Sequence, residues 1–220
     1  MKNVIKHGLI WSVMLMLLSG FQILDEKSEK ILNESKAKME ALKDFSANLK
    51  YEIKNKSTRL APVARTGKVK YKQGNKYVLS MADQEIYCDG ETLWLYLPED
   101  KEVTILNYDP SEEGMSLESI LGVYQASASS RYEGTEVVHG KKCHKIYLAV
   151  KDQNLEYNQA NVWINVSSKM LEKVSLIDRK QTVTTYEFSS ISTNRGLSDK
   201  DFQFDINKHS DVDVYDEREG

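Results

Sequence analysis

The feature that most constrains the fold is a strict alternation of apolar and polar side chains. Between Phe45 and Ile53 every second residue is apolar, and the residues between them are polar. Successive side chains of a β-strand point to opposite faces, so this spacing places all the apolar side chains on one face. A strand of this kind needs only one apolar partner layer.

The same alternation recurs along most of the chain. Asp89-Gly90 separates two such runs and is a strong signal for a β-hairpin. We therefore predict roughly nine to eleven strands, most of them antiparallel, and a sheet of that many strands must curl. The further strand-like runs are 69–71, 77–81, 86–88, 93–97, 103–105, 137–138, 146–150, 162–166, 174–176 and 186–188.

Two segments have helical spacing instead. Residues 25–43 carry apolar side chains three and four positions apart and contain no Gly or Pro, which predicts an amphipathic helix. Ser116 can cap a second, short helix. We expect both helices to cover the concave apolar face of the curled sheet. No linker divides the rest of the chain, so we expect one domain, residues 23–220.

The N-terminus is typical of an export signal. Lys2 and Lys6 precede an apolar run of about fourteen residues, which is shorter than the roughly twenty needed to span a membrane. We expect residues 1–22 to be cleaved, with a retained anchor as the alternative. No cysteine follows Gly20, so a lipidation site is not expected.

Charge and motifs exclude several functions. The formal net charge is −3 and the basic residues form no dense cluster, so we expect no nucleic-acid partner. No catalytic motif is present, and we expect no enzyme activity and no cofactor. His139, Cys143 and His144 are the nearest approach to a metal site, but we expect no metal. Cys88 could pair with Cys143 in a disulfide or be a separate buried thiol.

Several stretches together resemble the LolA family of periplasmic lipoprotein carriers. The most specific is Ile86-Tyr87-Cys88-Asp89-Gly90-Glu91-Thr92-Leu93-Trp94-Leu95-Tyr96, which is similar to the family's hairpin. The stretches 44–49, 67–72, 162–166, 202–204 and 212–216 follow in the family's order. The resemblance implies an α+β fold that is mainly antiparallel β: an incomplete, half-open β-barrel with helices covering its concave face.

The resemblance also implies a function. A periplasmic carrier of this kind shields the acyl chains of lipoproteins in an apolar groove. It receives them from an inner-membrane ABC-type releasing complex and delivers them to an outer-membrane acceptor. We expect it to act as a monomer. The alternative is a periplasmic binding protein on the same half-barrel that senses lipid or lipoprotein without delivering it.

The predicted groove combines strand and helix residues. Some family members carry a lid-latching Arg where this chain has Gln73, so Gln73 and Arg65 are the candidate polar contacts of the lid, with Arg131 as the alternative to Arg65. The predicted groove residues are Tyr77, Leu79, Met81, Ile86, Leu93, Leu95, Ile105, Leu117, Ile120, Leu121, Ile146, Leu148 and Ile164.

Overall fold

A computed structural model describes residues 26–58, 60–109, 123, 127–150, 152–153 and 155–218 of the chain. The N-terminal helix covers residues 26–40. The strands are β1 (Asp44–Asn55), β2 (Val63–Lys72), β3 (Lys76–Met81), β4 (Glu85–Asp89), β5 (Thr92–Leu97), β6 (Glu102–Asn107), β7 (Ser127–Val138), β8 (Lys141–Val150), β9 (Tyr157–Asn165), β10 (Leu171–Asp178), β11 (Thr182–Thr193) and β12 (Asp213–Asp216). Two short 3₁₀ helices, η2 (Asp199–Phe202) and η3 (Ile206–Lys208), precede β12.

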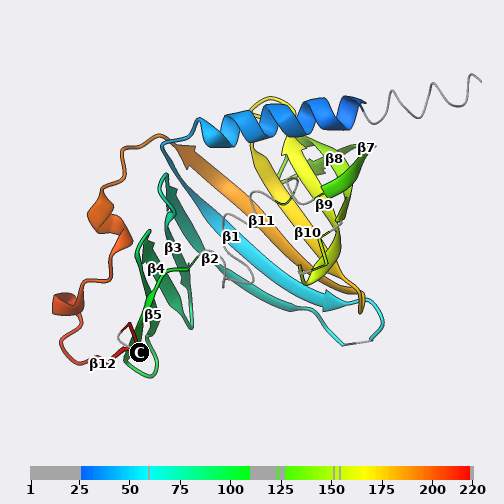
Figure 1. Ribbon diagram of the computed structural model, residues 1–220. Helices are drawn as coiled ribbons and strands as arrows, with labels where there is room; N and C mark the ends of the chain where they lie inside the picture. Colours follow the sequence, from blue (N-terminus) through cyan, green and yellow to red (C-terminus); the bar gives the residue numbers. More distant parts are fainter. Residues whose placement is uncertain are drawn as a thin grey trace, which may run out of the picture.

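The strands form one open sheet. Their order is β12-β6-β5-β4-β3-β2-β1-β11-β10-β9-β8-β7, and only the pairing of β12 with β6 is parallel. The long strands β1 and β11 lie at the centre, and the sheet curls away on both sides of them (Figure 1). Because β7 and β12 lie at opposite ends of this order, the sheet is not closed. The predicted fold, a half-open barrel of mainly antiparallel β-structure, is confirmed.

The cross-strand register confirms which side chains share the inner face. Leu49 lies opposite Phe188, and Phe45 lies opposite Tyr71 and packs on its ring at 5.4 Å between centroids. Directly opposite residues of antiparallel strands point to the same side of the sheet. The alternating apolar residues of β1 therefore join those of β2 and β11 in one core.

The predicted hairpin at Asp89-Gly90 is confirmed as the connection of β4 and β5. Asp89 Oδ1 accepts a hydrogen bond from the backbone N–H of Thr92 at 2.9 Å. Gly90 has φ +95°, in the left-handed region that glycine adopts without steric cost.

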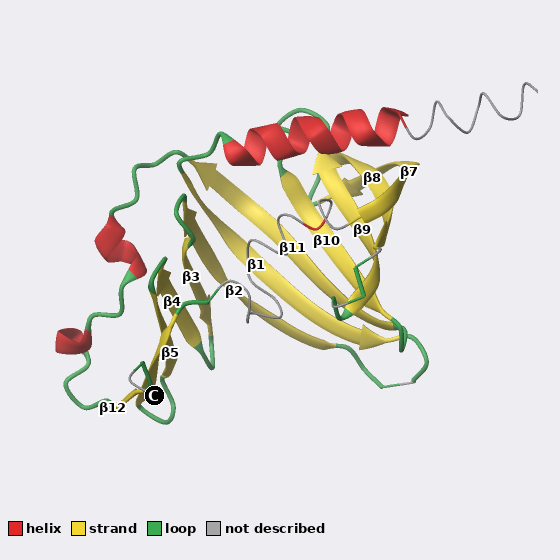
Figure 2. Cartoon of the chain, viewed as in Figure 1, coloured by secondary structure: helices red, strands yellow, loops and turns green. Residues whose placement is uncertain are grey.

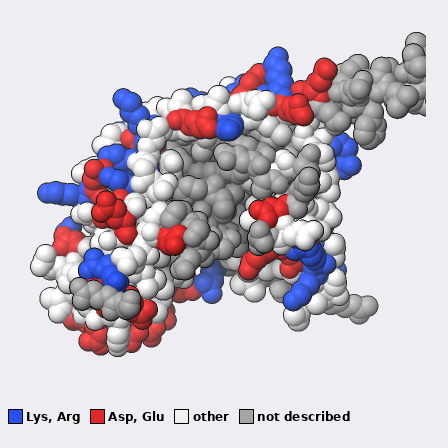
Figure 3. All heavy atoms as spheres, viewed as in Figure 1, with Lys and Arg blue, Asp and Glu red and all other residues white. Residues whose placement is uncertain are grey.

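The N-terminal helix crosses the upper end of the barrel (Figure 2). Ile31, Leu32 and Leu42 of this segment are buried in the same core as the inner face of the sheet. At the start of the helix the hydroxyl oxygens of Ser28 and Ser130 are 2.6 Å apart, which connects the helix to β7. The outward side of the helix carries both acidic and basic side chains (Figure 3). In the described ranges no helix is long and apolar enough to cross a membrane.

A second, smaller core lies on the outer face of β4 to β6. Phe204, from the segment after η2, packs on Tyr87 and Tyr96 with ring centroids 5.7 and 4.9 Å away. This packing explains why β5 is apolar on both faces: Leu93 and Leu95 face inward, while Trp94 and Tyr96 face the C-terminal segment.

Two strands differ from what the sequence predicts. The strand expected at Val137 and Val138 begins ten residues earlier, at Ser127. It is an edge strand of mostly polar side chains, and Val137 is 73% exposed, so the alternation of buried residues is weak. The sequence pattern does not predict β12 as a strand, because its four residues are all exposed.

Candidate functional site

The inner face of β3 to β5 is an apolar surface that is only partly buried. Leu79, Ile86 and Leu95 lie side by side across the three strands in register, and Tyr77, Cys88 and Leu93 form the next row. Leu79, Met81, Ile86, Leu93 and Leu95 all retain some exposure, whereas Tyr77 is buried. The structure thus brings together the six groove residues predicted for this half of the barrel.

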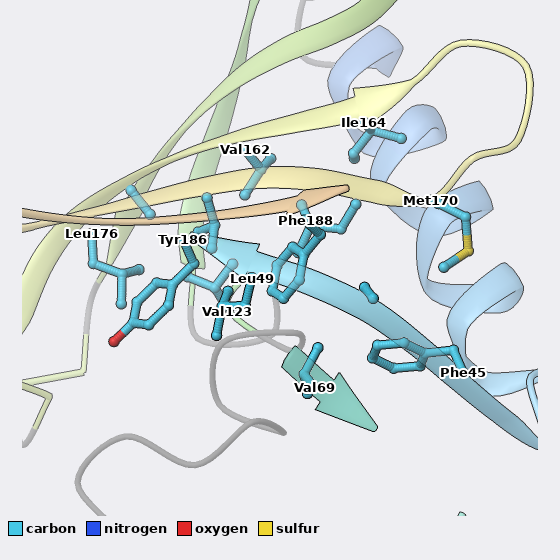
Figure 4. Close-up of a cluster of buried hydrophobic side chains, with 14 of the residues drawn as sticks. Phe45, Leu49, Val69, Val123, Val162, Ile164, Met170, Leu176, Tyr186 and Phe188 are labelled. Carbon is cyan, nitrogen blue, oxygen red and sulfur yellow. The ribbon is translucent and has the colours of Figure 1, made fainter. Parts of the chain in front are cut away.

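The other half of the inner face is tightly packed. Ile146 lies opposite Val162, Leu148 lies opposite Ala160, and all four side chains are fully buried, as is Ile164. They belong to the same core as the helix and β1. Figure 4 shows this core, in which Leu49 and Tyr186 lie beside Val123. The predicted groove residues Ile146, Leu148 and Ile164 therefore lie on the inner face.

The prediction that Ile105 lines the groove is wrong. It lies opposite Trp94, whereas Leu106 lies opposite Leu93. Ile105 therefore faces outward, and Leu106 takes the inner position. The apolar residues of β5 and β6 occur on both faces, so alternation alone does not show which set is inner. Leu117, Ile120 and Leu121 lie outside the described residues, but Val123, just beyond them, is buried in the inner core.

The inner face also contains aromatic residues that the groove prediction did not include. Tyr51 and Tyr186 pack together at 5.2 Å between ring centroids, on adjacent β1 and β11. Burial raises the pKa of the Tyr186 hydroxyl, so this group remains a neutral phenol at physiological pH. Both tyrosines belong to alternating runs in the sequence, 45–53 and 186–188, and this alternation could have predicted their inward position.

Gln73 connects the barrel to the covering helix. Its side-chain Nε2 donates a hydrogen bond to the backbone carbonyl of Glu40 at 3.0 Å, and its backbone N–H donates to the carbonyl of Lys43. The last carbonyls of a helix lack partners within the helix, and Gln73 supplies one. Arg65 is elsewhere, at the opposite end of β2, where it pairs with Asp83 at 2.5 Å.

The candidate metal residues are not brought together. Cys143 faces outward opposite Asn165, whereas His144 faces inward opposite Ile164. The hydroxyl of Tyr132 is 3.3 Å from His144 Nδ1, and burial lowers the pKa of His144. No group of three metal-ligating side chains occurs in the part of the chain that the structure describes. Cys88 and Cys143 lie on β4 and β8, both buried and not joined in a disulfide.

These features define a class of protein. An open, curled sheet presents an apolar inner face beneath a helix that is connected to the barrel by a few polar contacts. This arrangement is a binding fold for an apolar ligand. The comparison with protein families agrees: the model of the outer membrane lipoprotein carrier protein LolA matches residues 41–205. The chain belongs to the LolA family.

Individual relatives are distant. The outer-membrane lipoprotein carrier protein of Legionella pneumophila (strain Lens) is 22% identical over 203 residues, which cover 91% of this chain and 96% of the relative. A conserved protein from Thermus thermophilus superposes with a TM-score of 0.56 at 11% identity, covering 86% of this chain and 99% of the other. Lipoprotein LppX from Mycobacterium tuberculosis gives 0.51 at 18% identity, with 79% and 98% coverage. These two structures share the fold.

Proposed function

We propose that this protein is a periplasmic carrier that shields the acyl chains of lipoproteins and transports them from the inner to the outer membrane. The observation that carries the proposal is the half-buried apolar surface of β3 to β5, which includes Leu79, Ile86 and Leu95. A closed core would bury these side chains fully. An acyl chain laid along them would complete their burial.

The energetics require such cover. Each CH₂ exposed to water costs about 0.8 kcal/mol, so one chain of about sixteen carbons represents roughly 12 kcal/mol. A lipoprotein cannot cross an aqueous compartment without a carrier that removes this exposure. The cargo must also leave again, so the carrier must lose some of its own contacts when it loads.

The helix at 26–40 is suited to giving up its contacts with the barrel when cargo loads. Its polar links to the barrel, among the described residues, include one buried contact, Ser28 to Ser130, and two accessible ones, Gln73 to Glu40 and Lys169 to Glu34 at 2.9 Å. Accessible ion pairs contribute at most about 1 kcal/mol each. The apolar contacts of Ile31 and Leu32 would be replaced by acyl contacts as the helix moves, so the net cost of opening stays small.

The remaining partners follow from this role. The carrier would accept lipoproteins from an inner-membrane ABC-type releasing complex and transfer them to an outer-membrane acceptor. It would work as a monomer, because one half-barrel supplies the whole groove. Export through the segment 1–22, with cleavage of that segment, would bring it to the periplasm.

A paired substitution tests the groove. Leu95→Glu places a charge on the half-buried inner surface, where acyl chains would lie, and we expect it to abolish binding of acylated material while the fold persists. Val137→Glu is the matched control, because Val137 is exposed. The measurement is mass spectrometry of lipoprotein that copurifies with each variant after expression in a periplasm. Equal recovery with both variants would contradict the proposed groove.

Depletion in the native cell distinguishes transport from sensing. If the protein is a carrier, its loss leaves lipoproteins at the inner membrane, and fractionation will detect them there. Normal delivery of lipoproteins in depleted cells would instead favour a protein that senses lipid or lipoprotein.

A further inference from the structure

A cavity lies at the rim of the barrel, where the helix at 26–40 passes the starts of β8 and β10 and the ends of β9 and β11. Its volume is about 670 Å³, within the range of small-molecule sites. Four regions supply its polar lining: Lys38 from the helix, Lys141 and Lys142 from the start of β8, Asn165, Ser167, Ser168 and Glu172 at and beside the turn between β9 and β10, and Thr193 from the end of β11.

The walls of this cavity are held together by buried polar contacts. Lys141 Nζ lies 2.9 Å from both carboxylate oxygens of Glu172, which is 1% exposed. Asn165 Nδ2 donates to the same carboxylate at 3.0 Å. A buried charge of this kind must be paired, so the charge of Lys141 is already neutralised.

The positive charges of Lys38 and Lys142 have no counter-charge among the described residues. Both side chains are exposed, and neither takes part in an ion pair or hydrogen bond with another described residue. The cavity therefore carries an excess of two positive charges. Lys38 comes from the helix and Lys142 from β8, so two different elements supply these cations.

The turn at Ser167 and Ser168 is preorganised. Asn165 Oδ1 accepts hydrogen bonds from the backbone N–H groups of both serines, at 2.9 and 3.0 Å. The backbone N–H of Val166 donates to the carbonyl of Lys142 at 3.0 Å, which joins this turn to β8. Ser167, Ser168, Lys38 and Lys142 thus line one cavity, whose lining also includes the apolar residues Met170 and Ile191. The Ser168 hydroxyl accepts a hydrogen bond from the backbone N–H of Met170 at 3.3 Å and can still donate its own proton.

We propose that this cavity binds a phosphate ester, supplied either by the headgroup of an anionic phospholipid or by a soluble organic phosphate. Phosphate oxygens accept several hydrogen bonds at once, which matches two ammonium and two hydroxyl donors better than a single carboxylate does. The apolar wall can contact the carbon skeleton of the ester. This inference does not depend on acyl-chain binding in the barrel.

The experiment uses two probes and a double variant. Binding of glycerol 3-phosphate is measured by calorimetry, and binding to vesicles by cosedimentation with phosphatidylglycerol or with phosphatidylcholine. The test variant is Lys38→Gln with Lys142→Gln. The control is Lys54→Gln with Lys68→Gln, which removes the same charge from two exposed strand residues. Circular dichroism checks the fold of both.

We expect wild type and control to bind at least one phosphate probe equally, and the test variant to bind at least about tenfold more weakly. Binding of phosphatidylglycerol vesicles identifies a membrane headgroup, whereas binding of glycerol 3-phosphate alone identifies a soluble ester. Equal weakening in both double variants, or no binding of either probe by the wild type, overturns the proposal. Acylated material should copurify with the test variant unchanged, so failure here is distinguishable from failure of the carrier function.

Discussion

Asp44 is a buried carboxylate at the point where the chain enters β1. It accepts hydrogen bonds from the backbone N–H groups of Arg195, Gly196 and Leu197, at 2.7, 2.9 and 3.3 Å. Burial opposes ionisation, but these three bonds outweigh it and hold the pKa of Asp44 below its usual value. Asp44 thus fixes the start of the C-terminal segment to the central strand.

The substitution Asp44→Asn tests this contact. The amide retains one acceptor oxygen for three donors, so we expect a loss of about 2 kcal/mol in the free energy of unfolding at pH 7. Because the pKa of Asp44 is lower in the folded protein, its stabilisation is present above about pH 4 and is lost as the pH falls through the folded value. The difference between wild type and variant should therefore shrink in acid.

Urea unfolding at pH 7 and at pH 3 measures both effects. Asp83→Asn is the control, since Asp83 forms an accessible pair with Arg65 and should change stability by less than about 1 kcal/mol. A difference between wild type and Asp44→Asn that stays constant with pH would contradict the assignment.

Gln73 offers a second prediction at the residue scale. Leucine in its place cannot donate to the Glu40 carbonyl, so we expect amide hydrogens in the last turn of the helix to exchange about two- to fivefold faster. Arginine retains N–H donors and should preserve the protection. Hydrogen–deuterium exchange by mass spectrometry compares the two variants. Equal exchange in both would mean that Gln73 does not secure the helix.

At the scale of the elements, aromatic packing around Phe204 holds the C-terminal segment against the outer face of the sheet. Phe204 is buried against Tyr87 and Tyr96 and stacks on His209 at 4.7 Å. Phe204→Ala should therefore cost about 3 kcal/mol and release residues after η2 from the outer face. Limited trypsin digestion should cut at Lys208 sooner than in the wild type. Ile206→Ala is the control, because Ile206 is 41% exposed; comparable sensitivity in both variants would rule out the anchoring role.

The elements also show where sequence patterns are sufficient. Alternation locates a strand whenever one face is buried and the other is exposed to solvent, as in β1. When both faces are apolar, alternation does not show which residues face inward. For this reason the sequence predicts Ile105 on the inner face, although Ile105 lies opposite the outward-facing Trp94. Alternation weakens at sheet edges such as β7, where exposed residues such as Val137 follow no burial pattern.

For the whole molecule, the sequence supports a curled antiparallel sheet with an N-terminal helix, but not the long-range pairings. β12 pairs with β6 across about a hundred residues of intervening chain, and nothing local in either strand encodes that partner. The cavity beside Lys38 cannot be predicted from the sequence either, because its lining residues come from four separate regions that only the fold brings together.

Under the proposed carrier function, carriage by the whole molecule would depend on movement of the helix relative to the barrel. Ser28 on the helix and Ser130 on β7 have hydroxyl oxygens 2.6 Å apart, so cysteines at both positions can form a disulfide across this contact. We expect the oxidised double variant to keep the fold but to take up acylated cargo at least about tenfold more slowly, because the helix cannot leave the sheet.

Reduction should restore uptake in the same sample, which separates the crosslink from the two substitutions. Cys88 and Cys143 are buried and so should not compete for the new bond. Binding of a fluorescent acyl probe, followed before and after addition of a reductant, provides the measurement, with Ser28→Cys alone as the control. If the oxidised variant loads as fast as the reduced one, cargo enters without displacing the helix at its β7 end. The entrance must then lie along the half-buried strands β3 to β5, where Leu79, Ile86 and Leu95 remain accessible.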